Sequence, residues 1–123
     1  MTKKYNVIIV GGGPVGTFAA SELSQTSGLS VLLIEKGRDI DGRWCLAHDQ
    51  SVPCISCMPG HLVCGLGGAG AWSDGKLTLS SQIGGRLVEY LRESNTETPI
   101  KYVDDIYLKF GTSNKLYGGR RRS

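Results

Sequence analysis

Residues 6 to 16 read Asn6-Val7-Ile8-Ile9-Val10-Gly11-Gly12-Gly13-Pro14-Val15-Gly16, an apolar run that leads directly into the spacing G-x-G-x-x-G. The unbroken apolar run predicts a β-strand that is buried on both faces. A second apolar run, residues 31–34, ends at the acid Glu35. Strand, glycine turn, helix, strand and acid follow one another in this order in the first βαβ unit of a dinucleotide-binding fold.

Each glycine of the turn has its own physical role. Gly11 permits the tight turn out of the strand, Gly13 lets the backbone approach a pyrophosphate, and Gly16 lets the helix pack closely on the sheet. Pro14 fits the first helical position, because the N–H it lacks would have no intrahelical partner there. The other amides of this turn and the positive end of the helix dipole favour a phosphate. We therefore expect a dinucleotide site made by Gly11, Gly12, Gly13, Pro14, Val15 and Gly16.

The residues after the turn complete the unit. Val15, Ala19 and Leu23 have helical spacing, and we expect Gly28 to end this helix as its C′ residue. Glu35 lies about 20 residues beyond the turn, where an acid reaches a ribose 2′-hydroxyl and repels a 2′-phosphate. Its neighbour Lys36 is included in the predicted site. The alternative is a βαβ unit whose glycines serve packing alone.

Two stretches together resemble one family. The run YNVIIVGGGPVGTFAASEL, followed by VLLIEKG, is similar to the N-terminus of flavoproteins with two dinucleotide-binding domains. The run GLGGAGAWSDGKLTLS, residues 65–80, resembles a motif of the group called FAD-dependent dehydrogenases, or NAD(P)/FAD-dependent oxidoreductases. The resemblance implies FAD as the bound cofactor, with the glycines on its pyrophosphate and Glu35 on its adenosine ribose. It also implies NAD(P)H as an electron donor or acceptor in the longer protein.

Members of that family are several times longer, so the resemblance implies that this chain is an N-terminal portion. We expect an α/β fold, an incomplete Rossmann-like FAD-binding domain, with the βαβ unit at residues 1–38, a Cys- and Gly-rich segment at 39–81 and a helical segment at 82–123. The expected function is the FAD-binding portion of a flavin-dependent oxidoreductase that transfers hydride through flavin N5. A non-catalytic fragment, or a metal- or cofactor-binding module that needs a partner chain, is the alternative. So small a piece predicts low stability and weak FAD binding.

Residues 37–81 show little periodicity, and irregular segments of this length in compact domains are usually functional. Glycines in the second half would allow the backbone to approach a cofactor closely. By resemblance, such a segment runs under the pyrophosphate and the isoalloxazine, with Lys76 near flavin N1 and the C2 carbonyl, where its charge would stabilise the reduced ring. A surface turn at residues 73–76 explains the same residue types equally well. The candidates here are Gly68, Ser73, Asp74 and Lys76.

All four cysteines fall between residues 45 and 64, with both histidines among them. Thiolate and imidazole at short spacing suit zinc or an iron–sulfur cluster. Cys54 and Cys57 form C-x-x-C, a spacing that also suits a redox dithiol. Reduced cysteines without a cofactor are a third alternative, whereas structural disulfides do not fit a cytosolic protein. The candidate metal ligands are Cys45, Cys54, Cys57 and Cys64.

Apolar spacing downstream predicts two helices. The first covers residues 81–93. The second has Thr98 as its N-cap, Pro99 at its first position and Gly111 as its stop. These faces indicate packing rather than a chemical site.

Composition adds what we do not expect. No targeting segment precedes the first strand and no apolar run approaches the about 20 residues that span a bilayer, so we expect a cytoplasmic protein without a membrane partner. The net charge of +3 depends partly on residues 120–122, a run of arginines too short to define a binding face. We therefore expect no nucleic-acid partner, although a flavoprotein acting on RNA remains an alternative. The sequence does not identify the substrate, the oligomeric state or a catalytic acid or base.

Overall fold

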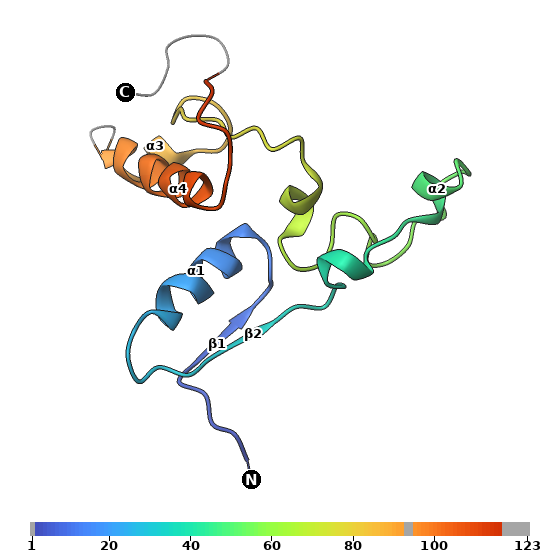
Figure 1. The fold of residues 1–123 in the computed structure, drawn as a ribbon, viewed down its shortest axis with the longest axis horizontal. Coiled ribbons are helices and arrows are strands. Elements are labelled where there is room, and N and C mark those ends of the chain that lie inside the picture. The colour runs from blue at the N-terminus through green and yellow to red at the C-terminus, as the bar shows by residue number, and fades with distance from the viewer. Residues whose placement is uncertain (1, 93–94, 117–123) are drawn as a thin grey trace. The chain divides into compact units, whose positions relative to one another are not determined.

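The structure is a computed structural model that describes residues 2–92 and 95–116 (Figure 1). The chain divides into two compact units, Met1–Asp74 and Gly75–Ser123. The arginines at positions 120–122 lie outside the described residues. In the part of the chain that is described, no helix has the length and apolar character to cross a membrane. The elements are β1 (Val7–Val10), α1 (Pro14–Ser24), β2 (Val31–Ile34), η1 (Ile40–Gly42), α2 (Leu46–Asp49), η2 (Gly68–Trp72), α3 (Leu87–Tyr90) and α4 (Glu97–Lys109).

The first unit opens with the expected βαβ arrangement. Strands β1 and β2 pair in parallel, in a register that places Val7 opposite Val31 and Val10 opposite Ile34. The Gly11 amide donates to the Ile34 carbonyl at 2.8 Å and extends the ladder into the turn. Because parallel strands need a crossover, α1 connects the end of β1 to the start of β2. The α/β, Rossmann-like fold class predicted from the sequence is confirmed.

Helix α1 begins where the sequence predicts and ends earlier. Pro14 occupies its first position, after Gly13 as N-cap. The helix is capped at Gln25, so the prediction of Gly28 as the C′ residue is wrong. Gly28 instead lies in the following turn, closed by a hydrogen bond from the Leu29 amide to the Thr26 carbonyl at 3.3 Å, where its φ of +80° suits a glycine.

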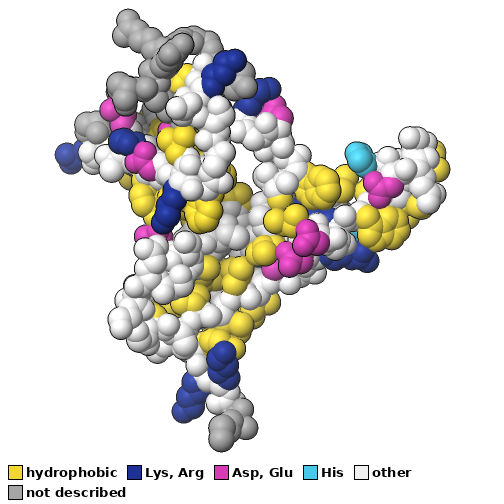
Figure 2. Space-filling model, in the orientation of Figure 1, with side chains coloured by type: hydrophobic (Ala, Val, Ile, Leu, Met, Phe, Trp, Pro, Cys, Tyr) yellow, Lys and Arg dark blue, Asp and Glu magenta, His cyan; other side chains and the backbone are white. Residues whose placement is uncertain are grey.

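One face of the β1–β2 pair is covered and the other is exposed. On the covered face a Cβ at Gly16 of α1 would lie 3.5 Å from Cγ2 of Ile9. On the other face Ile8 is 58% exposed and Val10 is 82% exposed. Figure 2 shows apolar side chains at the surface over the strands. The expectation of strands buried on both faces is therefore wrong for the described residues, among which no apolar side chain is fully buried.

In the second unit the first predicted helix is much shorter than expected. Helix α3 contains only Leu87–Tyr90. Gly84 and Gly85 both have a φ of +74°, which is left-handed and cannot continue an α-helix. The predicted helix over 81–93 is therefore wrong before residue 87, and its last residue lies outside the described part of the chain.

Helix α4 is the longest helix of the described residues. Its N-cap is Thr96 rather than Thr98, and Pro99 is the third helical residue instead of the first. A proline is tolerated there because the first amides of a helix have no intrahelical acceptor. Gly111, with a φ of +96°, follows the C-cap Phe110, so the predicted stop is confirmed.

Candidate dinucleotide-binding site

The candidate site is the turn between β1 and α1, and its glycines differ in what they permit. Gly11 has a φ of +105°, where other residues are strained. A Cβ at Gly16 would meet the Gly11 backbone, with the carbonyl carbon at 3.0 Å and the oxygen closer. Gly13 has an ordinary φ of −70°, and no heavy atom lies within 4 Å of where its Cβ would be. Gly11 and Gly16 therefore shape the turn, whereas Gly13 leaves open space beside it.

The first turn of α1 offers backbone amides that no capping side chain satisfies. The amides of Val15 and Gly16 belong to the first turn, where a helix offers no intrahelical acceptor. No side chain caps the helix at Gly13, and the first turn contains no acidic residue. Pro14 and Val15 are exposed. This helix end can therefore stabilise an anion such as a phosphate.

Glu35 follows β2 and connects the two strand ends. Its Oε2 accepts a hydrogen bond from the Gly12 amide at 2.6 Å, and its Oε1 accepts one from the Gly37 amide at 2.8 Å. These bonds, that from Gly12 first, lower the pKa of Glu35 below its usual value. The adjacent exposed Lys36 lowers the same pKa through its amide and its charge. A carboxylate has about four acceptor positions, so it retains capacity for ribose hydroxyls.

The glycine-rich segment runs along the turn. The Gly67 amide donates to the Gly12 carbonyl at 2.6 Å, and a Cβ at Gly68 would lie 3.2 Å from Cδ of Pro14. Gly65 pairs with Arg38 as an isolated parallel bridge. The predicted residues Gly12, Pro14, Glu35 and Gly68 thus lie in one neighbourhood. The sequence predicted that the glycines of this segment let its backbone approach a cofactor. In the structure, this backbone approaches the glycine turn instead.

The remaining members of the predicted set follow η2. Ser73 caps η2 with its amide on the Gly70 carbonyl at 3.3 Å. Ser73, Asp74 and Lys76 are exposed, and each has an interaction within the protein. Gly75 has a φ of +74°, as a surface turn requires. Lys76 lies in the second unit, Gly75–Ser123.

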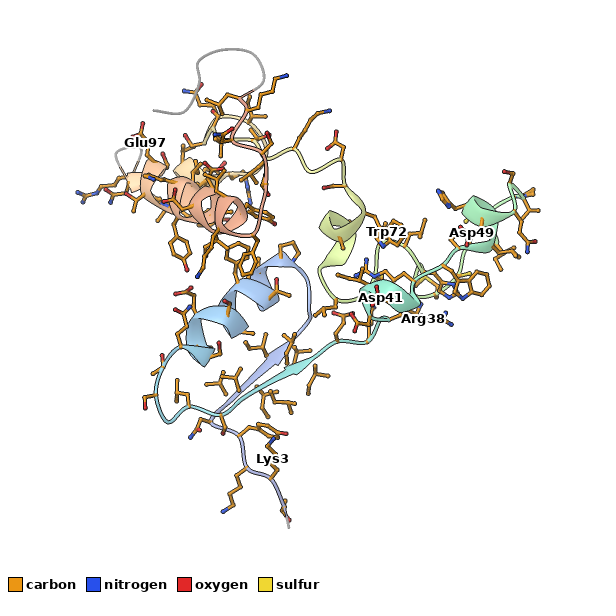
Figure 3. The ribbon with its side chains drawn as sticks, in the orientation of Figure 1. Lys3, Arg38, Asp41, Asp49, Trp72 and Glu97 are labelled. Carbon is orange, nitrogen blue, oxygen red and sulfur yellow. The ribbon has the colours of Figure 1, made fainter. Side chains whose placement is uncertain are left out.

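Arg43 is a site residue that the sequence reasoning missed. Its side chain is buried, with 5% exposure, immediately after η1. Nη1 donates to the carbonyls of Leu62 at 2.9 Å and Gly68 at 2.8 Å, and Nη2 donates to the carbonyl of Leu66. Nothing in the spacing separated this arginine from the exposed Arg38, which is labelled in Figure 3 on the segment after β2. Gly37 was missed too, although a glycine two residues after a strand-ending acid is a usable signal.

The cysteines do not gather. All four are free; Cys54 is exposed and the other three are half-buried. Among residues 2–92 and 95–116, no group of three or more His, Cys, Asp or Glu side chains could hold a metal ion. The Ser56 amide donates to Sγ of Cys54 at 3.4 Å, and the rings of Trp44 and His61 lie 5.9 Å apart. The zinc or iron–sulfur site therefore stays a prediction from the sequence.

Comparison with known proteins agrees with this geometry. Residues 9–72, more than half of the chain, match the NAD(P)-binding Rossmann-like domain. The chain belongs to this family. The match begins in β1 and ends at the last residue of η2, so this Rossmann-like domain includes the glycine turn, Glu35, Arg43 and the glycine-rich segment.

One relative extends well beyond this Rossmann-like domain. A protein of Clostridium beijerinckii (strain ATCC 51743 / NCIMB 8052), titled only an uncharacterized protein, is 37% identical over 75 residues. These residues are 61% of this chain and 14% of that protein, so the similarity spans a small part of the relative's length. No solved structure matches the chain.

Proposed function

We propose that this chain is the FAD-binding portion of a flavin-dependent oxidoreductase. The observation that carries the proposal is the turn at residues 11–16, which opens α1 while the Glu35 carboxylate holds its Gly12 amide at 2.6 Å. One hydrogen bond thereby joins the turn, whose amides would donate to a diphosphate, and the carboxylate that would accept from a ribose. Membership of the NAD(P)-binding Rossmann-like family supports a dinucleotide as the ligand.

The residues of the turn fit the ADP part that FAD and NAD share. The open space at Gly13 lets a diphosphate approach, and the amides of Val15 and Gly16 would donate to it. The ionised Glu35 would accept from the ribose 2′- and 3′-hydroxyls. When FAD is bound, the flavin supplies hydride transfer at N5, and the protein positions it.

The preference for FAD over NAD rests on the resemblance of residues 65–80 to the FAD-dependent dehydrogenases. In the proposed assignment NAD(P)H exchanges electrons with the flavin through parts of a longer protein. The negative charge of Glu35 would disfavour a ligand with a 2′-phosphate in the turn itself.

A second candidate function is a cofactor-binding module that acts only with a partner chain. The exposed face of β1, where Val10 is 82% exposed, favours it, because apolar strand faces are usually covered. This candidate differs from the first in one measurable respect. It predicts that the isolated chain does not bind ADP, whereas a longer polypeptide containing the same sequence does.

The test is a calorimetric titration of the purified chain with ADP, its 2′-phosphate analogue, FAD and NAD. We expect ADP and FAD to bind, with the 2′-phosphate analogue at least about tenfold weaker than ADP, because like charges meet at Glu35. A flavin absorbance band in the protein as isolated would separate FAD from NAD. Absence of ADP binding in both the chain and a longer polypeptide would refute the proposal, and equal binding of the two nucleotides would refute the role of Glu35.

A further inference from the structure

We infer that Arg43 is a positioning residue of the dinucleotide site, whose buried guanidinium fixes the glycine-rich segment against the phosphate-binding turn. The inference rests on the proposed function of that turn. Arg43 donates to the carbonyls of Leu62, Leu66 and Gly68, all within one short stretch of chain. A planar guanidinium has five donors in a rigid fork, so it can fix several carbonyls at once.

The fixed carbonyls flank the residue that contacts the turn. Gly67 lies between Leu66 and Gly68, both bonded to Arg43, and its own amide donates to the Gly12 carbonyl at 2.6 Å. The Gly12 amide in turn donates to Glu35 at 2.6 Å. Arg43 is thus connected, through Gly67, to the Gly12 carbonyl of the phosphate-binding turn.

The charge of Arg43 indicates more than a structural role. Its acceptors are neutral carbonyls, and none of the ion pairs found in the described residues includes it. Its Nε is buried without a hydrogen-bond partner. A buried cation without an anion is costly. An anionic ligand bound at the turn, to which Gly68 lies close, would offset part of this cost.

The experiment compares Arg43→Gln, which removes the charge and the fork, with Arg43→Lys, which keeps the charge alone. The control is Arg38→Gln in the same segment, where the exposed side chain donates only to the Gly42 carbonyl at 3.3 Å. Each full chain is titrated with ADP and with adenosine. We expect Arg43→Gln to lower ADP affinity about tenfold, because bonds to a charged group are worth that much or more, while adenosine affinity stays unchanged. Arg43→Lys should lose less, and the control nothing.

A second measurement uses the milder variant, Arg43→Lys, which keeps the positive charge. Hydrogen exchange in Arg43→Lys should be faster at the Gly67 amide, which depends on the fork, and unchanged at the paired amides of β1. This local readout distinguishes loss of positioning from general destabilisation.

Four outcomes would overturn the inference: unchanged ADP affinity in both Arg43 variants, equal losses for ADP and adenosine, an unchanged Gly67 amide, or unfolding of both variants. The last would make Arg43 a residue of the whole fold and not of the turn. If neither the unmodified chain nor the longer polypeptide binds ADP, the proposed function itself fails; ADP binding by the unmodified protein is therefore measured before any variant is compared.

Discussion

The glycine turn (residues 11–16) and the cysteine segment (residues 45–60) belong to the same unit, yet different interactions hold them. In the turn, Gly67 and Glu35 bond to Gly12 across long stretches of sequence. In the described structure of residues 45–60, the hydrogen bonds join residues at most 4 positions apart. The comparison teaches that a glycine pattern specifies where backbones approach one another, whereas a cysteine pattern specifies side-chain chemistry without its geometry.

The largest expected effect comes from Gly16→Ala. The new Cβ would lie 3.0 Å from the Gly11 carbonyl carbon, and neither backbone can move without separating α1 from the strands. We expect a loss of about 1–3 kcal/mol or more in the free energy of unfolding, the cost typical of overpacking, together with loss of ADP binding. Urea unfolding followed by circular dichroism measures it. Gly42→Ala is the matched control, since its nearest neighbour is Cβ of Arg38 at 3.8 Å; equal stability of the two variants would contradict the packing role.

Gly13→Ala should separate ligand binding from folding. The position has open space and an ordinary φ of −70°, so we expect the unfolding free energy to change by less than about 0.5 kcal/mol. The methyl group would occupy the approach of the pyrophosphate and lower ADP affinity at least about tenfold, or 1.4 kcal/mol. Calorimetry on the folded variant checks this. Wild-type ADP affinity in this variant would show that the pyrophosphate does not approach at Gly13.

A glycine that contacts the turn and a glycine of the cysteine segment give a direct comparison. Gly67 has a φ of +85° and a Cβ there would lie 3.1 Å from Cβ of Ala71, so Gly67→Ala should cost about 1–2 kcal/mol in unfolding free energy. Gly60 in the cysteine segment would meet Cγ2 of Val63 at 3.4 Å, an ordinary contact, so Gly60→Ala should change stability by less than about 0.5 kcal/mol. Thermal unfolding of both variants measures the difference. Equal shifts would mean that the two regions are equally constrained.

The effect of pH should be smaller and should follow Glu35. Because hydrogen bonds lower the pKa of Glu35 in the folded chain, its contribution to stability is fully present above the usual glutamate pKa of about 4.3 and is lost as pH falls to the lowered pKa. Glu35→Gln should therefore be less stable than the wild type at neutral pH. Below the usual glutamate pKa, the stability of this variant should depend less on pH than that of the wild type. Melting temperatures between neutral and strongly acidic pH measure both slopes. Parallel curves would show that another carboxylate dominates.

The smallest effect is expected from the double substitution Cys54→Ser and Cys57→Ser. Cys54 is exposed and Cys57 is half-buried, so stability should change by less than about 0.5 kcal/mol. ADP affinity should also be retained, because the glycine turn does not use these thiols. Metal analysis of the unmodified chain is the companion measurement. Stoichiometric zinc or iron that disappears in the variant would show that this segment becomes ordered around a metal.

The βαβ unit could be predicted because every local signal agreed. The first apolar run predicted β1, Pro14 suited the start of α1, and the second apolar run predicted β2. The helix expected over residues 81–93 does not form before residue 87, because Gly84 and Gly85 have a left-handed backbone that no α-helix contains. Apolar spacing alone does not reveal this. Periodicity is thus informative only where each residue can adopt the required φ.

The candidate site was predictable to the extent that it depends on backbone shape. The pairing of the glycine turn with Glu35 follows from chain spacing that the fold imposes. Arg43 could not be predicted, because its acceptors are carbonyls, which every residue carries, and a side chain that binds them has no characteristic spacing. The cysteines are the opposite case. Their spacing is distinctive, but residue types alone do not determine where the sulfur atoms lie when no regular element positions them.

The hydrogen bond from the Gly12 amide to Glu35 couples the loops that leave β1 and β2. Neither loop can shift without dragging the other. A ligand that binds only one loop and displaces it must also displace the other, whereas a ligand that contacts both loops binds a preorganised site. This coupling would make the affinity of the intact ligand greater than the affinities of its separate parts would predict.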